Sequence, residues 1–224
     1  MTDLGPDFAP ARAPGYIPAF RIDALTPLYD PVQRWLVREP MLKPLLASQG
    51  DVRPGLRVLD VGCGTGTLAI LMKRRCPDAE IIGLDGDMAV LKRAQVKAAR
   101  AGVEVAFHLA LAGQLPYPTA SFDRVMSSLF FHHLTRSAKH EAAGDMFRVL
   151  RPGGELHVMD FGAPRGLAAR AVGQIIRHFE QVADHIDGRL PGVFQLAGFT
   201  EVAEVERHMT LVGMVTFYRA RKEQ

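Results

Sequence analysis

Short apolar runs alternate with longer amphipathic stretches through the middle of the chain. The runs, which are typical of buried strands, occupy residues 56–61, 79–85, 103–109, 122–129 and 154–161. Stretches with apolar residues at helical spacing occupy residues 65–75, 87–102 and 137–150, and the last is followed by the turn "RPGG". Because strands that alternate with helices of this length form a parallel sheet covered on both faces, we expect an α/β fold.

The last part of the chain follows a different pattern. A helical stretch at residues 167–186 precedes "LPGVFQLAGF", and two strand-like runs follow at residues 200–208 and 210–220. The link between these two runs is too short to hold a crossover helix. We therefore expect the last two strands to pair antiparallel as a hairpin.

Prolines shape the N-terminal part of the chain. They recur at Pro6, Pro10, Pro14 and Pro18, a spacing that predicts an extended arm. Between residues 23 and 46 apolar residues return at helical intervals, but further prolines interrupt them, so short, broken helices are expected. We divide the chain into an N-terminal segment, residues 1–48, and a single globular unit, residues 49–224.

Composition narrows the class of protein. A chain of 224 residues that is 48% apolar and 23% charged can bury the core of one globular domain. The net charge is +3, but the basic residues are scattered, which favours a solvated surface over nucleic-acid binding. The two cysteines, Cys63 and Cys76, argue against a disulfide scaffold and favour the cytoplasm. Without a targeting signal or a long apolar window, we expect a soluble protein.

A glycine-rich segment, "VLDVGCGTGTL" at residues 58–68, follows the first strand of the regular region. Gly62, Gly64 and Gly66 fall in the first strand-to-helix turn, where ligands bind in open parallel sheets and where the missing Cβ allows close approach. Cys63 within this loop reads as a small packing residue. By itself the glycine spacing is a weak signal, since a tight turn without a ligand also explains it.

Two acids give the loop a more specific interpretation. Asp85 ends the second strand, where a carboxylate can accept both hydroxyls of a ribose. A dinucleotide site would carry a third glycine where Thr67 stands, and Asp60 would repel its pyrophosphate. Because Asp60 would attract an ammonium group, the ligand is expected to be a nucleoside with a positively charged amino-acid part.

The motifs "VLDVGCGTG", "GLDGD", "LPYPTASFDRVMSSLFFHHL" and "RVLRPGGELHVMDF" together resemble class I S-adenosylmethionine-dependent methyltransferases. The resemblance is greatest to small enzymes of ubiquinone and menaquinone biosynthesis. It implies a Rossmann-like, seven-stranded, mostly parallel sheet with an antiparallel C-terminal hairpin and helices on both faces. It assigns Asp60, Gly62, Gly64 and Gly66 to the methionine part of the cofactor, Asp85 to the ribose, Gly86 and Met88 to the adenine, and Ser128 and Leu129 to the floor beneath the sulfonium. Cys63, within the loop, is included in the cofactor-binding set.

The adenine end of the site departs from the family pattern. Leu111 stands where relatives carry an aspartate near the adenine amino group. Either backbone groups around Ala112 and Gly113 recognise the adenine, or the affinity for the cofactor is lower than usual; we favour backbone recognition because the other motifs are intact.

Candidate residues for the acceptor side follow the fourth strand and precede the first. His132 and His133 could take a proton from the acceptor, with a slight preference for His133, although a surface and a structural role would also explain the pair. The resemblance implies that the segment before the first strand closes over the cofactor through Tyr29. Asp160 could assist binding, whereas His157 reads as a core residue, and no metal site is expected.

The sequence therefore predicts transfer of a methyl group from S-adenosylmethionine to a small, apolar or amphipathic acceptor at carbon, oxygen or nitrogen. Two other functions stay open. An NAD(P)-dependent oxidoreductase uses a similar sheet, and a non-catalytic protein could have kept the S-adenosylmethionine site alone. The acceptor itself, the methylated atom and the oligomeric state are not determined by the sequence.

Overall fold

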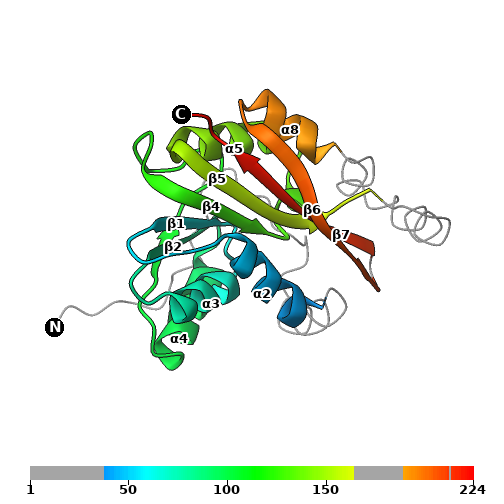
Figure 1. The fold of residues 1–224 in the computed structure, drawn as a ribbon. Helices are drawn as coiled ribbons and strands as arrows, with labels where there is room; N and C mark the ends of the chain where they lie inside the picture. The colour runs from blue at the N-terminus through cyan, green and yellow to red at the C-terminus, as the bar shows by residue number, and fades with distance from the viewer. Residues whose placement is uncertain (1–37, 164–188, 212) are drawn as a thin grey trace, which may run out of the picture.

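A seven-stranded sheet with the strand order β3-β2-β1-β4-β5-β7-β6 forms the centre of the molecule (Figure 1). The computed structural model describes residues 38–163, 189–211 and 213–224. The strands are β1 (Arg57–Val61), β2 (Glu80–Asp85), β3 (Ala106–Leu109), β4 (Phe122–Ser128), β5 (Leu150–Phe161), β6 (Thr200–Thr210) and β7 (Gly213–Arg221). Strands β1 to β5 pair in parallel, and β7 is antiparallel to both β5 and β6. The predicted parallel sheet and terminal hairpin are confirmed.

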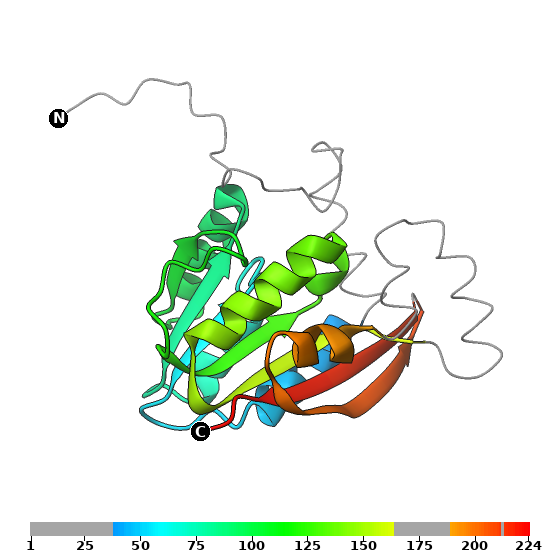
Figure 2. The same ribbon diagram turned by 90° about the horizontal axis from the view of Figure 1, so that it is seen from above.

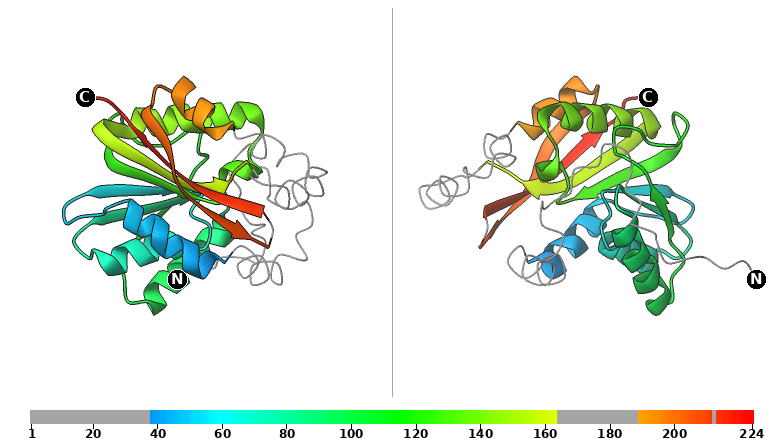
Figure 3. Two further views of the ribbon diagram at one scale, coloured as in Figure 1. Left: turned by 45° about the vertical axis from the view of Figure 1, so that its right-hand side comes forward. Right: turned by 180° about the vertical axis from the view of Figure 1, so that it is seen from behind.

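Helices cover both faces of this sheet (Figure 2). They are α2 (Glu39–Gln49), α3 (Thr67–Arg75), α4 (Met88–Arg100), the 3-10 turn η2 (Phe131–His133), α5 (Arg136–Val149) and α8 (Leu190–Leu196). Helices α2, α3 and α4 lie on one face, and α5 and α8 lie on the other (Figure 3). Side-chain caps start two of them: Asp87 accepts the Ala89 and Val90 amides before α4, and Thr135 accepts the Ala138 amide before α5.

The strand order reverses at β1. Strands β2 and β3 continue the sheet on one side of β1, while β4 and β5 continue it on the other. The loops after β1, β2 and β4 therefore leave the same carboxyl edge in different directions, which is where open α/β sheets bind ligands.

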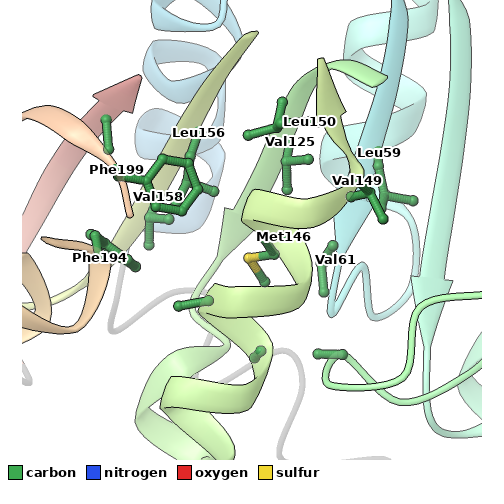
Figure 4. Close-up of a cluster of buried hydrophobic side chains, with 14 of the residues drawn as sticks. Leu59, Val61, Val125, Met146, Val149, Leu150, Leu156, Val158, Phe194 and Phe199 are labelled. Carbon is green, nitrogen blue, oxygen red and sulfur yellow. The ribbon is translucent and has the colours of Figure 1, made fainter. Parts of the chain in front are cut away.

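One apolar cluster fills the space between the sheet and helices α5 and α8 (Figure 4). Met146 and Val149 of α5 face Val61 and the neighbouring strand residues. Phe194 of α8 closes the far end, with ring centroids 5.5 Å from Phe131 and 6.2 Å from Tyr218. Burial of this surface is the main contribution to the stability of this layer.

A second cluster lies under α2 and α3. Leu42 and Leu46 of α2 pack there with Leu68 and Met72 of α3 and with Val58 of β1. The proposed division of the chain at residue 48 thus falls inside α2. Helix α2 shares this core, and the division itself stays a prediction.

The predicted "RPGG" turn and the predicted helix at residues 167–186 differ from the other elements. Strand β5 begins at Leu150 and runs through the residues of the predicted "RPGG" turn, because Gly153, with φ of 77°, lies in a register shift against β4. The helix predicted at residues 167–186 lies outside the described residues.

We expect Phe194→Ala to destabilise the protein by about 3–5 kcal/mol, because the ring is fully buried and its loss leaves a cavity. Leu196→Ala is the matched control in the same helix, since Leu196 is 80% exposed, and it should change stability by less than about 0.5 kcal/mol. Chemical denaturation measures both. Equal stabilities of the two variants would show that α8 does not anchor this core.

Candidate cofactor and acceptor site

The loop after β1 has left-handed backbone at each of its glycines. Gly62, Gly64 and Gly66 have φ angles of 68°, 55° and 71°, which residues with a side chain rarely adopt. The amides of Gly62 and Cys63 donate hydrogen bonds of 2.8 and 3.0 Å to the Leu84 carbonyl of β2. The loop is thereby fixed to the neighbouring strand before it enters α3.

The three glycines differ in what surrounds them. A Cβ at Gly62 would lie 2.2 Å from Cδ2 of Phe130, and one at Gly66 would lie 2.8 Å from Cζ of Phe107. A Cβ at Gly64 would meet nothing within 4 Å. Gly62 and Gly66 therefore permit tight packing, whereas Gly64 has open space where a side chain would be, so a ligand can come close to its backbone.

Asp85 is oriented toward this loop. Its Oδ2 accepts a 2.9 Å hydrogen bond from the Gly64 amide, and its Oδ1 accepts one of 3.1 Å from the Asp87 amide. Burial raises the pKa of Asp85, and these amides oppose that shift. The remaining lone pairs of the carboxylate are available to ribose hydroxyls beside Gly64.

Asp60 is the most unusual group in the site. It is completely buried, and among the described residues neither carboxylate oxygen has a hydrogen-bond partner. Burial raises the pKa of Asp60 to about 7. The Lys43 ammonium and the Ala69 amide oppose this shift, although the amide is not within hydrogen-bonding geometry of the carboxylate. A buried carboxylate without a partner is costly, so this position fits a cationic group such as an ammonium.

Cys63, between these glycines, is also buried, and burial raises the pKa of its thiol well above the usual range. A Cβ at Gly83 would lie 3.0 Å from its sulfur. This side chain packs against β2 as a neutral thiol, in agreement with the packing role expected from the sequence.

The residues predicted to surround the adenine lie along the ends of β2 and β3. Gly86 follows β2 directly, and Met88 is the first residue of α4. The Ala110 amide donates to the Asp85 carbonyl, and the segment then turns through a Gln114 to Leu111 backbone hydrogen bond. Ala112 and Gly113 lie in that turn. Residues 111–113 therefore present backbone groups, and no carboxylate, to a ligand at this position.

A second set of residues lies at the ends of β4 and β5, on the other side of the point where the strand order reverses. Ser128 ends β4, and Leu129 follows with a left-handed φ of 54°, which is strained for a residue with a side chain. The Leu129 amide donates a 2.7 Å hydrogen bond to the Met159 carbonyl of β5. These contacts direct the next residue, Phe130, onto Gly62.

Asp160 organises this second set. Its Oδ2 accepts the amides of Phe130 at 3.0 Å and of His132 at 3.4 Å, and its Oδ1 accepts the amide of Phe161 at 2.7 Å. The same Oδ1 lies 2.8 Å from Nδ1 of His132. Since a carboxylate only accepts, Nδ1 carries the proton and Nε2 is the atom that can exchange one.

The two histidines are therefore not equivalent. His132 is buried and oriented by Asp160, while His133 is half-buried with its ring centroid 3.9 Å from that of His132. Sequence reasoning slightly preferred His133; the geometry favours His132. The available signal was the position of Asp160 at the end of β5, beside the strand that precedes both histidines.

Tyr29 and His157 are the other residues that the sequence motifs brought forward. Tyr29 lies outside the described residues. His157 is buried inside β5, with Nε2 3.3 Å from Oε2 of Glu155, and burial lowers its pKa. That position agrees with the core role expected for His157.

A parallel sheet with a glycine turn after β1 and carboxylates at the ends of β1 and β2 defines a nucleoside-binding α/β fold. A "Methyltransferase domain" family model matches residues 58–154. The chain is 38% identical to the demethylmenaquinone methyltransferase of Thermus thermophilus over 62% of this chain and 61% of that protein. It is 34% identical to the one of Deinococcus radiodurans over 73% of this chain and 70% of that protein.

Among solved structures, the YcgJ protein of Bacillus subtilis has the same fold, with a TM-score of 0.65 and 18% identity over 81% of this chain and 98% of that one. The chain belongs to the S-adenosylmethionine-dependent methyltransferase family, whose cofactor is S-adenosylmethionine. The predicted resemblance and cofactor are confirmed. Of the helices that the structure describes, none has the length and apolar character needed to cross a membrane.

The raised pKa of Asp60 predicts a pH-dependent stability of the ligand-free protein. A buried acid whose pKa is raised from 3.8 to about 7 stabilises the fold at pH below its ordinary value, and this contribution is lost as the pH rises through 7. Asp60→Asn stays neutral throughout. The free energy of unfolding of Asp60→Asn minus that of the wild type should therefore increase by on the order of 2–4 kcal/mol from pH 5 to pH 8.

Chemical denaturation at the two pH values measures this change. Asp78→Asn, which alters an exposed carboxylate, is the control and should change little. If Asp60→Asn shifts stability equally at both pH values, the Asp60 carboxylate does not titrate in this range.

Proposed function

We propose that this protein transfers the methyl group of S-adenosylmethionine to a small, apolar or amphipathic acceptor that gives up a proton. The observation that carries the proposal is the close contact between the glycine loop and the His132 loop. Phe130, two residues before His132, packs directly on Gly62. A ligand seated on the glycine loop would thus have the His132–Asp160 pair as its neighbour.

The residues present fit the cofactor in chemistry and order. Asp60 offers a buried anion for the ammonium of the methionine part, and Gly64 offers open backbone. Asp85 offers an oriented carboxylate for the ribose. The backbone of Ala112 and Gly113 is available to the adenine. When bound, S-adenosylmethionine supplies an electrophilic methyl group on a positively charged sulfur.

His132 is the residue that we assign to proton transfer. The acceptor would give up its proton to Nε2 of His132 as the bond from the methyl group to sulfur is replaced by one to the acceptor, with S-adenosylhomocysteine as the other product. Asp160 would stabilise the imidazolium. Asp160 holds the imidazole in this orientation by accepting Nδ1–H and the amides of the loop. Asp160 is thus a positioning residue for the imidazole.

Aromatic side chains make the surroundings of His132 apolar. Phe161 lies edge-on to the His132 ring with a centroid distance of 4.9 Å, and Phe130 and Phe131 lie on the same loop. Because charge on the sulfur disappears during methyl transfer, exclusion of water favours the transition state. An apolar acceptor would be accommodated by the same side chains.

The relatives suggest a first acceptor to test. The Thermus and Deinococcus proteins are named demethylmenaquinone methyltransferases, and a relative from Amycolatopsis mediterranei is named 27-O-demethylrifamycin SV methyltransferase. A hydroquinone ring combines an apolar body with an ionisable hydroxyl, which suits a histidine base. We therefore propose a quinol-type aromatic acceptor for this chain.

Cofactor binding is tested by calorimetry with S-adenosylhomocysteine. The wild type should bind S-adenosylhomocysteine. Asp85→Ala should lose about 1–3 kcal/mol of the binding free energy, because a charged hydrogen-bond acceptor is removed. Asp78→Ala, at an exposed position, should bind as the wild type does. Binding of NADPH in place of S-adenosylhomocysteine would favour an oxidoreductase and contradict the proposal.

Proton transfer is tested by following a labelled methyl group from S-adenosylmethionine to reduced demethylmenaquinone. His132→Gln should lower kcat by about 10²–10⁴-fold and leave affinity for S-adenosylhomocysteine unchanged. His133→Gln, one position further on, is the control and should retain most of the activity. A larger loss in His133→Gln than in His132→Gln would reverse the assignment. No methyl transfer by the wild type to any of a panel of quinols and phenols would favour a non-catalytic binding protein.

A further inference from the structure

Lys43 is a nearly buried cation that the site described above does not use. It lies in the middle of α2 and is 9% exposed. Its Nζ lies 3.0 Å from Oε2 of Glu39, one helical turn earlier, in an ion pair whose side chains are 11% and 15% exposed. Lysine is rarely buried to this extent unless it is paired, because removing an ammonium from water is costly.

The location of this ion pair brings it to the methionine end of the cofactor site. Leu42 and Leu46 of α2 pack in the same apolar cluster as Val58 of β1. Side chains alternate along a strand, so Asp60 points to the same face of the sheet as Val58. The Lys43 ammonium is close enough to lower the pKa of both Asp60 and Cys63, which lie at the start of the glycine loop.

The charged groups of Glu39, Lys43 and Asp60 are unevenly paired. Lys43 pairs with Glu39, whereas Asp60, whose pKa the Lys43 ammonium lowers, has no hydrogen-bond partner among the described residues. An α-amino acid group carries an ammonium and a carboxylate on the same carbon. Its ammonium would satisfy Asp60, and its carboxylate would give Lys43 a second anion on the side away from Glu39.

We propose that Lys43 binds the α-carboxylate of the methionine part of S-adenosylmethionine, while Glu39 holds the ammonium of Lys43 in position. Lys43 and Asp60 then form a complementary pair that recognises the zwitterion as a unit. Helix α2, although it precedes the glycine loop in sequence, becomes part of the cofactor site. The inference rests on the proposed cofactor-binding site and names a further residue of it.

A purely structural role for Lys43, as a counter-charge that makes burial of Asp60 tolerable, predicts different behaviour. In that case its removal would disturb the loop and weaken every ligand that binds there. If Lys43 instead contacts the α-carboxylate, its removal weakens only ligands that have this group. Ligands that differ in the amino-acid part therefore separate the two roles.

Calorimetry with three ligands provides the test: S-adenosylhomocysteine, its decarboxylated form, which lacks only the α-carboxylate, and methylthioadenosine, which lacks the whole amino-acid part. Lys43→Gln should weaken S-adenosylhomocysteine by about 10- to 100-fold, the loss expected for one charged hydrogen bond. The same variant should bind the decarboxylated form and methylthioadenosine as the wild type does. Lys92→Gln, at an exposed position of α4, should behave as the wild type with all three.

Comparison of ligands on the wild type gives an independent readout that needs no variant. The wild-type protein should bind S-adenosylhomocysteine more tightly than the decarboxylated form by about the same 10- to 100-fold. Equal weakening of all three ligands in Lys43→Gln, or no such preference in the wild type, would overturn the role of Lys43. Failure of the wild type to bind S-adenosylhomocysteine at all would instead overturn the cofactor site.

Discussion

The contact between Gly62 and Phe130 is the constraint on which the site depends. It joins the loop after β1 to the loop after β4, across the point where the strand order reverses. A side chain at residue 62 would overlap the ring, so only glycine allows this approach. Phe130 is directed there by the left-handed backbone of Leu129 and by the hydrogen bond of its own amide to Asp160. The two halves of the site are thus held together by backbone geometry.

The site contains features that oppose folding, and the surrounding layers support them. Asp60 is buried without a hydrogen-bond partner in the described part of the chain, and Leu129 has a strained backbone. Each lies at the carboxyl edge of the sheet, between apolar clusters that cover the two faces. Such features persist only where packing determines the local conformation, and they concentrate where a ligand relieves the cost.

The sequence predicted those parts of the structure that depend on local pattern. The strands and helices of residues 57–149, the terminal hairpin, the glycine loop and the acid at Asp85 all follow from periodicity and short motifs. The choice between His132 and His133 did not, because adjacent residues differ only in the direction that η2 gives them relative to Asp160. Lys43 was missed for a related reason. In an amphipathic helix a lysine is usually assigned to the solvated face, and only the packing of α2 on the sheet shows that it is buried.

Electrostatics relates these groups to the chemistry. Burial raises the pKa of both Asp60 and Asp85, so the fold holds these two carboxylates at the expense of their solvation. A ligand with an ammonium group at Asp60 relieves this cost, and a neutral or anionic ligand does not. On the other side of Gly62, Phe130 and Phe161 lie beside the His132 loop, and the exclusion of water by such rings would favour a reaction in which charge on sulfur is lost. In the proposed site, positive charge would thus be attracted at the methionine end of the cofactor and lost at the sulfur.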